Sequence, residues 1–513
     1  MIVGAGPTGL ALALSLARSG IKVRLIEKLR EPAATSRAIG IQARTLEMLD
    51  MFGLADAFVD RGHKGRAGNI YAGSRRLVHL DLALLASRYP YILFLEQTET
   101  ERLLSEALAK LGVEVERGVE MISFQQTPEL VTLVTRTGNG ASEQIECEYL
   151  VGCDGAHSAT RRGLDLQFDG KTLSQQFLLA DLDMESWLTN DEFHIFTSPD
   201  GLLAIFPMSG GHRVIAEIPS HSEDPGSEPQ LAEIEAIVAR RVDAPLRLSG
   251  MRWSSYFKVN SRLASRLQDG RVFLVGDAAH IHSPAGAQGM NTGIQDAFNL
   301  GWKLAFVLRG DAAPDLLATY QAERYPVERG VLRKTELLTR IVSLKSPFLR
   351  FFRDRIAPRI TALERVQRVA RRTISQIGVS YRALPVPTLR GPGDVLRAGD
   401  RAPDTWVQVH DNAGAKRLHA LLDPTRFTLL LITRDQPVAA SNRGSTVPLQ
   451  SDDRVQVVIG IDAPGNGIAE SANYAGEDRF YLIRPDGYLA LVGPLGHAAD
   501  AKDFLQRYRP DVA

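Results

Sequence analysis

The spacing of apolar and polar residues in the first third of the chain predicts strands that alternate with helices. The apolar stretch Met1 to Val3 precedes a glycine-rich turn, and the apolar run 11–17 that follows has helical character. Residues 21–27 then alternate as a second strand. The further elements predicted here are helices at 43–51 and 100–111 and strands at 113–117 and 131–135. This order of elements is typical of an α/β fold with a parallel sheet.

The periodicity changes to two residues between Lys171 and about Pro219. Alternating stretches are joined there by the turns 199–201 and 209–211. Such strands form an antiparallel sheet with one covered face, so we expect a second domain inserted into the first.

Helical periodicity returns in the last part of the chain, after a buried strand near residues 272–275. A long helix is predicted at 294–308 and an arginine-rich helical region at 331–377. The Pro/Gly-rich stretch 385–394 has the composition of a linker. Beyond it, two unbroken apolar strands suit a buried parallel pair, and Pro485-Asp486-Gly487 predicts a hairpin turn.

These patterns divide the chain into five segments. They are an α/β domain at 1–170, with 69–94 contributing to the substrate side; an antiparallel sheet at 171–254; a return to the first domain at 255–330; a helical region at 331–390; and a C-terminal domain at 395–513. A chain of 513 residues is too long for a single core.

Composition excludes several classes of protein. The 60 basic residues balance the 60 acidic ones, so no overall field recruits nucleic acid. The two cysteines, Cys147 and Cys153, suit a reduced protein with buried thiols. The chain has no apolar run long enough to span a membrane and no basic signal region at its start, and we therefore expect a cytoplasmic protein.

The glycines near the N-terminus predict a dinucleotide site. Gly4, Gly6 and Gly9 have G-x-G-x-x-G spacing between a strand and a helix, with Pro7 and Thr8 inside the motif. Gly4 permits the tight turn, Gly6 lets the pyrophosphate approach, and Gly9 lets the helix pack on the strand.

An acid follows at the end of the second strand. Glu27, followed by Lys28, can accept hydrogen bonds from the adenosine ribose and would repel a 2'-phosphate, which favours FAD or NAD over NADP. A solvated acid at a strand end is the alternative.

Two later stretches place polar residues after apolar strands. Asp154-Gly155 ends one strand, and Ser158 can cap a short helix that contains Arg161. This is either a strand, a turn and a capped helix, or part of a ligand site at the carboxyl end of a parallel strand.

The second of these stretches contains Gly276-Asp277, and Asp277 can accept from ribityl or ribose hydroxyls. Gly286 and Gly289 open the long helix, so that its amide groups face an electron-rich ring edge. His280 and His282 have H-x-H spacing, but no suitable third ligand follows, and we assign no metal.

Together these motifs resemble the class A flavoprotein monooxygenases, the para-hydroxybenzoate hydroxylase-like aromatic hydroxylases. The resemblance covers about the first 330 residues and rests on GAGPTG with Glu27, CDGAHSATR, and GDAAHIHSPAGAQGMNTGIQDAFNLGWKLA. It implies a Rossmann-like FAD-binding domain of the glutathione reductase type. The C-terminal segment resembles the thioredoxin-like domain of longer aromatic hydroxylases, but it has no cysteine, which excludes thiol redox chemistry.

The resemblance also implies roles for named residues. Residues matching Arg37 and Gln97 contact FAD, and those matching Asp154, Gly155, Ser158 and Arg161 serve both FAD and the transient NAD(P)H. Those matching Pro284, Gly289, Met290 and Asn291 line the isoalloxazine. NADPH or NADH would reduce FAD, dioxygen would add at flavin C4a, and the hydroperoxide would transfer one oxygen to an aromatic substrate.

One departure concerns the substrate. Phenol hydroxylases have an acid at the position of Ile39, and we identify no other catalytic base, which favours multi-ring or polyketide-like substrates over simple phenols. A reductase or epoxidase on the same fold and a non-enzymatic flavin-binding protein are the alternatives.

The arginine-rich helices predict a solvated face rather than a membrane-binding one. In the family this region contributes to the mouth of the substrate site or to a subunit interface, which leaves a homodimer open.

Overall fold

The computed structural model describes residues 1–34, 38–218, 228–282, 286–342, 346–382, 396–409, 415–433, 452–461 and 478–508. Arg37, Pro284 and the predicted linker 385–394 lie outside these residues.

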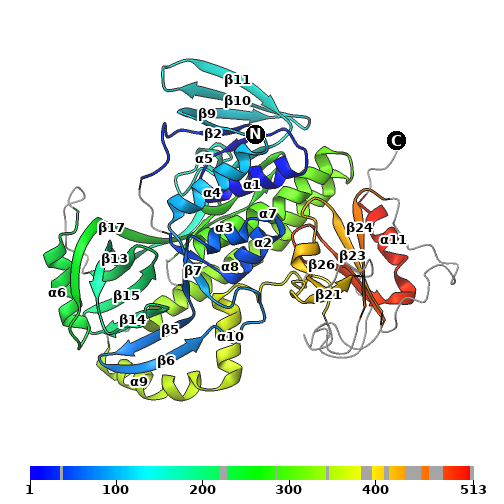
Figure 1. Ribbon diagram of the computed structural model, residues 1–513. Helices are drawn as coiled ribbons and strands as arrows, with labels where there is room; N and C mark the ends of the chain where they lie inside the picture. Colours follow the sequence, from blue (N-terminus) through cyan, green and yellow to red (C-terminus); the bar gives the residue numbers. More distant parts are fainter. Residues whose placement is uncertain are drawn as a thin grey trace.

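A six-stranded sheet forms the centre of the first domain, in the order β18-β19-β12-β1-β2-β8 (Figure 1). The strands are β1 (Ile2–Val3), β2 (Leu25–Glu27), β8 (Val115–Arg117), β12 (Leu150–Gly152), β18 (Gln268–Asp269) and β19 (Val272–Leu274). All adjacent pairs are parallel except β18–β19. The α/β prediction is therefore confirmed.

Helices cover one face of this sheet and a small sheet covers the other. Helix α1 (Pro7–Arg18) packs between α4 (Gln97–Ala109) and α7 (Gly289–Leu308). The opposite face packs against β9 (Val119–Gln126), β10 (Val131–Thr137) and β11 (Ser142–Cys147) through a separate apolar cluster that includes Val3 and Leu133. The remaining elements of the domain are α2 (Ala43–Met51), α3 (Ala55–Val59), α5 (Ala159–Gly163), the 3-10 turns η1 (Gly276–Ala278) and η2 (Pro314–Leu317), and the sheet of β3 (Gly40–Ile41), β7 (Ile92–Phe94) and β4 (His63–Gly65).

The second sheet has eight strands in the order β20-β17-β13-β16-β15-β14-β5-β6. These are β5 (Ala67–Ala72), β6 (Arg75–Asp81), β13 (Phe168–Glu185), β14 (Glu192–Ser198), β15 (Gly201–Met208), β16 (Gly211–Ile218), β17 (Arg247–Ala264) and β20 (His280–Ile281). Helix α6 (Leu231–Arg241) covers its outer face.

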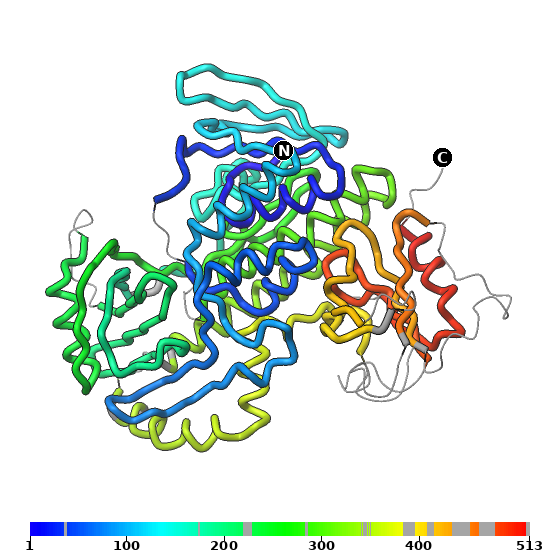
Figure 2. Tube along the Cα trace, viewed as in Figure 1, coloured from blue at the N-terminus to red at the C-terminus, as the bar shows by residue number. Residues whose placement is uncertain are grey.

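The strands predicted between residues 171 and 219 are antiparallel to one another, which confirms that prediction. Strand β5, from the first domain's part of the sequence, extends the sheet by pairing in parallel with β14 (Figure 2). Strands β13 and β17 continue past the expected limits at 171 and 254, and they join the two domains. They pair with each other between Phe168 and Glu185, with register shifts after Thr172 and Asp181.

A helical region follows the first domain. It comprises α8 (Ala318–Val342), α9 (Pro347–Thr361) and α10 (Glu364–Ile374). Helix α9 lies on β6, at the lower edge of the molecule in Figure 1.

The C-terminal domain contains a mixed sheet in the order β22-β21-β24-β23-β25-β26, with α11 (Asp500–Gln506) beside it. Its strands are β21 (Trp406–Val409), β22 (Ala415–Arg417), β23 (Phe427–Thr433), β24 (Val455–Ile461), β25 (Arg479–Ile483) and β26 (Leu489–Pro494). The predicted parallel pair is β23–β24 and the predicted hairpin is β25–β26.

The C-terminal domain shares an apolar core with α7. Trp302 and Phe306 of α7 meet Phe427 edge to face, with ring centroids 5.6 Å apart in both pairs. Buried charges also join the domains, since Arg44 donates to the Asp486 carbonyl at 2.7 Å and Arg401 donates to Glu47 at 2.9 Å. The domain therefore packs as part of the main body.

Candidate functional site

The predicted cofactor residues converge at one edge of the six-stranded sheet. Gly4 follows β1, Glu27 ends β2, Asp154 follows β12 and Asp277 follows β19. These four strands are adjacent and parallel, so their carboxyl ends lie side by side. This edge is where α/β sheets bind nucleotides.

The three glycines have the geometry of a nucleotide-binding turn. Gly4 has φ +100°, and a Cβ there would lie 2.3 Å from the Cys153 carbonyl oxygen. At Gly9 a Cβ would lie 1.9 Å from the Gly4 carbonyl oxygen, which accounts for the close packing of α1 on β1. At Gly6 a Cβ would meet no described atom within 4 Å. The space beside Gly6 is open, as a cofactor that approaches the backbone requires.

Pro7 and Thr8 begin helix α1. Pro7 is in the first turn, where its missing N–H costs no helical hydrogen bond. A Cβ at Gly276 or at Gly293 would lie 2.6 or 2.5 Å from Thr8 Oγ1. Thr8 therefore fits between η1 and α7 and fixes the spacing of the elements around the turn.

The two acids differ in how the protein holds them. The half-buried Glu27 carboxylate accepts the amides of Ala5 and Leu29, at 2.8 and 3.0 Å, which aims it at the glycine turn. Asp277 is exposed although its neighbours Gly276 and Ala278 are buried. An exposed carboxylate on a buried turn is suited to accept hydroxyl groups of a bound cofactor.

The stretch after β12 is held mainly by its own side chains. Asp154 Oδ2 accepts the amide of Thr160 at 2.9 Å, whereas its buried Oδ1 has no hydrogen-bond partner among the described residues. Ser158 Oγ accepts the Arg161 amide at 2.8 Å, the predicted helix cap.

The Arg161 side chain bonds to other parts of the protein. Its guanidinium donates to the carbonyls of Ala278 and Ala156, at 2.8 and 2.9 Å, and lies over the Phe168 ring. Arg161 therefore positions the turns after β12 and β19, and a direct contact with FAD stays a prediction for it.

Gln97 and Lys28 lie at the border of the site. The Gln97 side chain donates to the Glu101 carboxylate at 2.8 Å, and its backbone N–H donates to the Ala38 carbonyl. Ala38 follows Arg37 in the sequence. Lys28 is exposed.

The loop before α7 is tied to the strand β3. The buried Asn291 accepts the Gln42 amide at 2.9 Å and donates to the carbonyls of Gly40 and Ala287, at 2.7 and 2.8 Å. Both N–H donors of its side chain are thus used within the protein, so Asn291 shapes the loop, and a contact with the flavin ring stays a prediction.

Sequence reasoning missed the second tie of this loop, Gln42. Its Nε2 donates to the Gly286 carbonyl at 2.8 Å. Gly286 has φ +83°, and Ala287 has φ +51°, which is unusual for a residue with a side chain. Gly289 and Met290 then begin α7 with free amides directed along the helix axis.

A cavity of about 920 Å³ lies between this loop, the second sheet and helices α8 and α10. Its walls are mostly apolar, with Phe94, Phe177, Phe193 and Phe206 among them, and Gly286, Ala287 and Gln288 form part of its lining. Lys334 and Arg372 are the charged residues among the described lining, which contains no carboxylate, histidine or tyrosine. The cavity thus lacks a side-chain base within the described residues.

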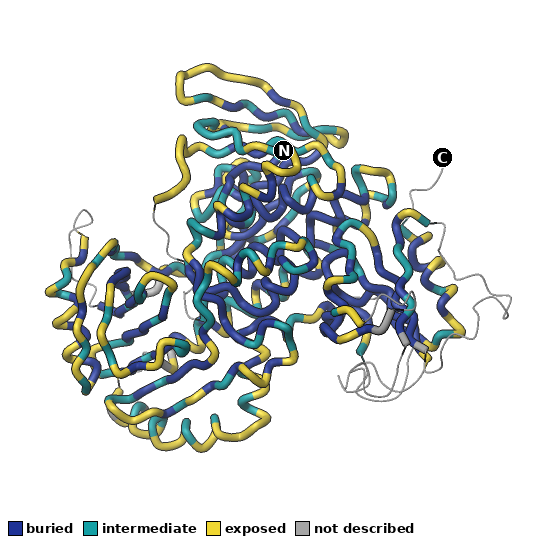
Figure 3. Tube along the Cα trace, viewed as in Figure 1, coloured by how far each residue is buried: buried dark blue, intermediate teal, exposed yellow. Residues whose placement is uncertain are grey.

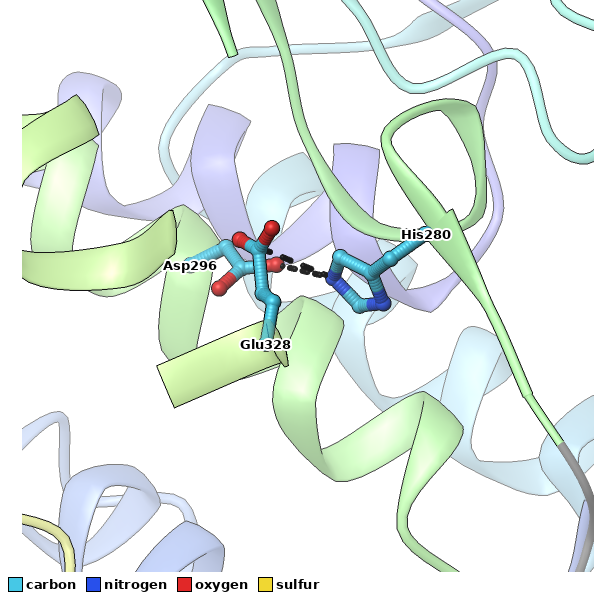
Figure 4. A group of neighbouring side chains, drawn as sticks. All are labelled: His280, Asp296 and Glu328. Atoms are coloured by element: carbon cyan, nitrogen blue, oxygen red, sulfur yellow. Dashed lines mark hydrogen bonds and ion pairs between the residues drawn. The ribbon is translucent and has the colours of Figure 1, made fainter. Parts of the chain in front are cut away.

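The side chains of His280, Asp296 and Glu328 form a buried cluster (Figure 4). His280 Nε2 is 2.7 Å from Asp296 and 3.9 Å from Glu328, and Arg324 donates to Asp296 at 2.6 Å. Burial opposes the charge on His280, but Glu328 and Asp296 outweigh it and raise its pKa to about 9. Burial and the charge of Asp296 raise the pKa of Glu328 to about 8.

These three residues are close enough to hold a metal ion. Arg324 already supplies a cation to the cluster, and so does protonated His280. We interpret the cluster as an ion network that fixes β20, α7 and α8, and His282 is not part of it.

The parallel sheet, the open glycine turn and the acids around one edge are the features of a dinucleotide-binding domain, and an apolar cavity adjoins the loop before α7. Residues 1–335 match the FAD binding domain family, and residues 396–509 match the C-terminal domain of aromatic-ring hydroxylases. The chain belongs to the FAD-dependent aromatic-ring hydroxylases, and it is a monooxygenase.

Sequence relatives and solved structures support the same family assignment. The chain is 35% identical to 6-methylpretetramide 4-monooxygenase of Streptomyces rimosus, over 96% of this chain and 90% of the relative. It is 31% identical to pentachlorophenol 4-monooxygenase of Sphingobium chlorophenolicum, over 95% and 92%. The structure of OxyS anhydrotetracycline hydroxylase from Streptomyces rimosus superposes with a TM-score of 0.78 at 32% identity, over 99% of this chain and 98% of that one. A reductase, an epoxidase or a non-enzymatic flavin protein is not favoured.

Proposed function

We propose that this monooxygenase hydroxylates a large, multi-ring aromatic molecule that binds as an oxyanion. The observation that carries the proposal is the apolar cavity of about 920 Å³, which has the flavin-side loop Gly286 to Gln288 in its wall. This volume is at the upper end of the usual range for small-molecule sites. Relatives named for 6-methylpretetramide and anhydrotetracycline support a large substrate.

FAD fits the residues at the sheet edge. Gly4, Gly6 and Gly9 would admit the pyrophosphate of FAD. Glu27 and Asp277 would accept hydrogen bonds from its ribose and ribityl hydroxyl groups. Bound FAD would supply the redox chemistry, in which NADPH or NADH provides two electrons, one oxygen atom of dioxygen enters the substrate and the other leaves as water. The open space at Gly6 and the exposed Asp277 support this placement.

The protein's own contribution is to orient the substrate and to exclude water. The phenylalanines of the cavity would hold the rings, and the amides at the start of α7 would face the electron-rich side of the flavin. With no base in the described lining, a substrate that ionises readily is favoured, and Lys334 and Arg372 would stabilise its negative charge.

The test is anaerobic stopped-flow reduction of the flavin by NADPH and by NADH, with multi-ring phenols and with pentachlorophenol. We expect an ionised multi-ring compound to accelerate reduction and to yield a singly oxygenated product in air. Arg372→Ala should raise KM about tenfold for that compound, the loss expected for one charged hydrogen bond, with kcat nearly unchanged.

Acceleration by pentachlorophenol alone would refute the large substrate, and a product without added oxygen would refute the hydroxylation. The cytoplasmic location and the homodimer stay predictions.

A further inference from the structure

Most of the exposed large apolar side chains of the described residues lie on or between α8, α9 and α10. Ten of the sixteen such residues in the described chain lie between 337 and 369. They are Leu337, Leu338, Ile341, Phe348, Phe351, Phe352, Ile356, Ile360, Leu363 and Val369. An exposed apolar area of this kind marks an interaction site. We call it the α9 surface.

Helix α9 has many exposed residues (Figure 3), and most of the exposed ones are apolar. Phe348, Phe352, Ile356 and Ile360 recur every four residues and so share one face, where they are 43–68% exposed. Arg353, in contrast, is only 11% exposed and donates to Thr197 of β14 at 3.0 Å. Helix α9 thus exposes large apolar side chains together with Arg355 and Arg359. The sequence analysis favoured a solvated basic face and did not predict its apolar part.

The α9 surface is also strongly basic. Residues 333–372 contain twelve arginines and lysines but only three acids, in a chain whose formal net charge is zero. The three acids, Glu336, Asp354 and Glu364, each form an ion pair with a basic residue. Among the basic residues of this stretch whose burial the structure describes, the exposed ones are Arg333, Lys334, Arg355, Arg359, Arg365, Arg368 and Arg372.

The substrate cavity reaches the protein surface at the same place. Leu338, Val369 and Arg372 line the cavity and are exposed members of this region. A partner that covers the α9 surface would therefore lie at the cavity entrance.

We propose that the α9 surface binds the anionic face of a lipid bilayer, in the manner of a peripheral protein. A bilayer offers apolar chains for the phenylalanines and negative headgroups for the arginines. A second copy of the chain fits less well, because a two-fold contact would place two strongly basic patches against each other.

Spanning the bilayer is not required, and among the described residues no helix is both long and apolar enough to do so. Binding to vesicles does not depend on the proposed substrate, so the two proposals can fail separately.

The test is flotation of the flavin-loaded protein with vesicles of phosphatidylcholine, alone or mixed equally with phosphatidylglycerol. We expect binding to the anionic vesicles only, with release at high salt. Phe352→Asp and the double variant Arg355→Glu/Arg359→Glu should each lower the bound fraction about tenfold.

Ile122→Asp is the matched control. Ile122 and Phe352 are each 44% exposed, but Ile122 lies on β9, on the opposite side of the molecule. This variant should bind vesicles as the wild type does, and unchanged flavin absorbance and Tm would show that all variants are folded. Failure of the wild type to bind anionic vesicles, or equal binding by Phe352→Asp, would overturn the proposal. A wild-type dimer that Phe352→Asp separates, without vesicle binding, would assign the surface to a second copy instead.

Discussion

Replacing Gly6 by alanine should weaken FAD binding without destabilising the protein. The φ and ψ angles of Gly6, −71° and −179°, suit alanine, and the new methyl group would meet no described atom within 4 Å. The free energy of unfolding of the flavin-free protein should therefore stay constant or rise by up to about 1 kcal/mol. FAD should lose about 1.5–3 kcal/mol of binding free energy, because the methyl group holds the pyrophosphate away from the backbone amides. This corresponds to a Kd about ten- to a hundredfold higher.

Gly9→Ala is the contrasting variant. Its methyl group would lie 1.9 Å from the Gly4 carbonyl oxygen and 3.3 Å from Cys153 Cβ, and the first contact is with backbone that cannot rotate away. We expect the flavin-free protein to lose at least about 1–3 kcal/mol of stability.

Urea unfolding of the flavin-free variants measures stability, and titration with FAD, followed by its fluorescence, measures affinity. If Gly6→Ala bound FAD within twofold of the wild type, the space beside Gly6 would not belong to the cofactor. If Gly6→Ala were as unstable as Gly9→Ala, the distinction drawn between the two glycines would be wrong.

Three other changes test the site. Asn291→Ala removes three buried hydrogen bonds and should lower the free energy of unfolding by about 3 kcal/mol in urea titrations; a loss below about 0.5 kcal/mol would contradict the role of Asn291 in the loop. Asp277→Ala should purify with little flavin absorbance, and a full complement of flavin would remove Asp277 from the cofactor site. Because the pKa of Glu328 is raised from 4.5 to about 8, the folded protein keeps a proton that the unfolded chain has lost, and stability should fall as pH rises through this window. In Glu328→Gln that fall should be smaller, and urea titrations across the window that matched the wild type would argue against a raised pKa.

Much of the sheet edge where the predicted cofactor residues lie could be predicted, because the sequence patterns that specify it are local. The roles of Gly4 and Gly9 follow from a few consecutive residues, and so does the cap at Ser158. The same is true of the parallel pair β23–β24, since each strand is an unbroken apolar run. In these cases the sequence pattern and the final contacts involve neighbouring residues.

The rest depends on contacts between distant parts of the sequence. Gln42 holds a carbonyl 244 residues away, and the Arg401–Glu47 pair spans 354 residues. Strands β5 and β6 show no strong alternation of apolar and polar residues in the sequence. Their place in the sheet depends on the pairing of β5 with β14, more than 100 residues later. The exposed apolar residues of α9 were not predicted, because the many arginines of this region alone resemble a solvated helix.

The shared core of α7 and the C-terminal domain limits how this enzyme can be rebuilt. Trp302 and Phe306 lie on α7, the helix whose first turn is predicted to face the cofactor. Arg484 of the C-terminal domain pairs with Glu323, the neighbour of Arg324 in the buried network. Removing the C-terminal domain would expose the apolar residues Trp302 and Phe306 of α7 to solvent. It would also leave Glu323 without Arg484 as a partner. A chimaera with a foreign C-terminal domain would thus need the matching face of α7 as well. The C-terminal family match begins at residue 396, but the two parts of the chain on either side of that residue share one core and depend on each other for stability.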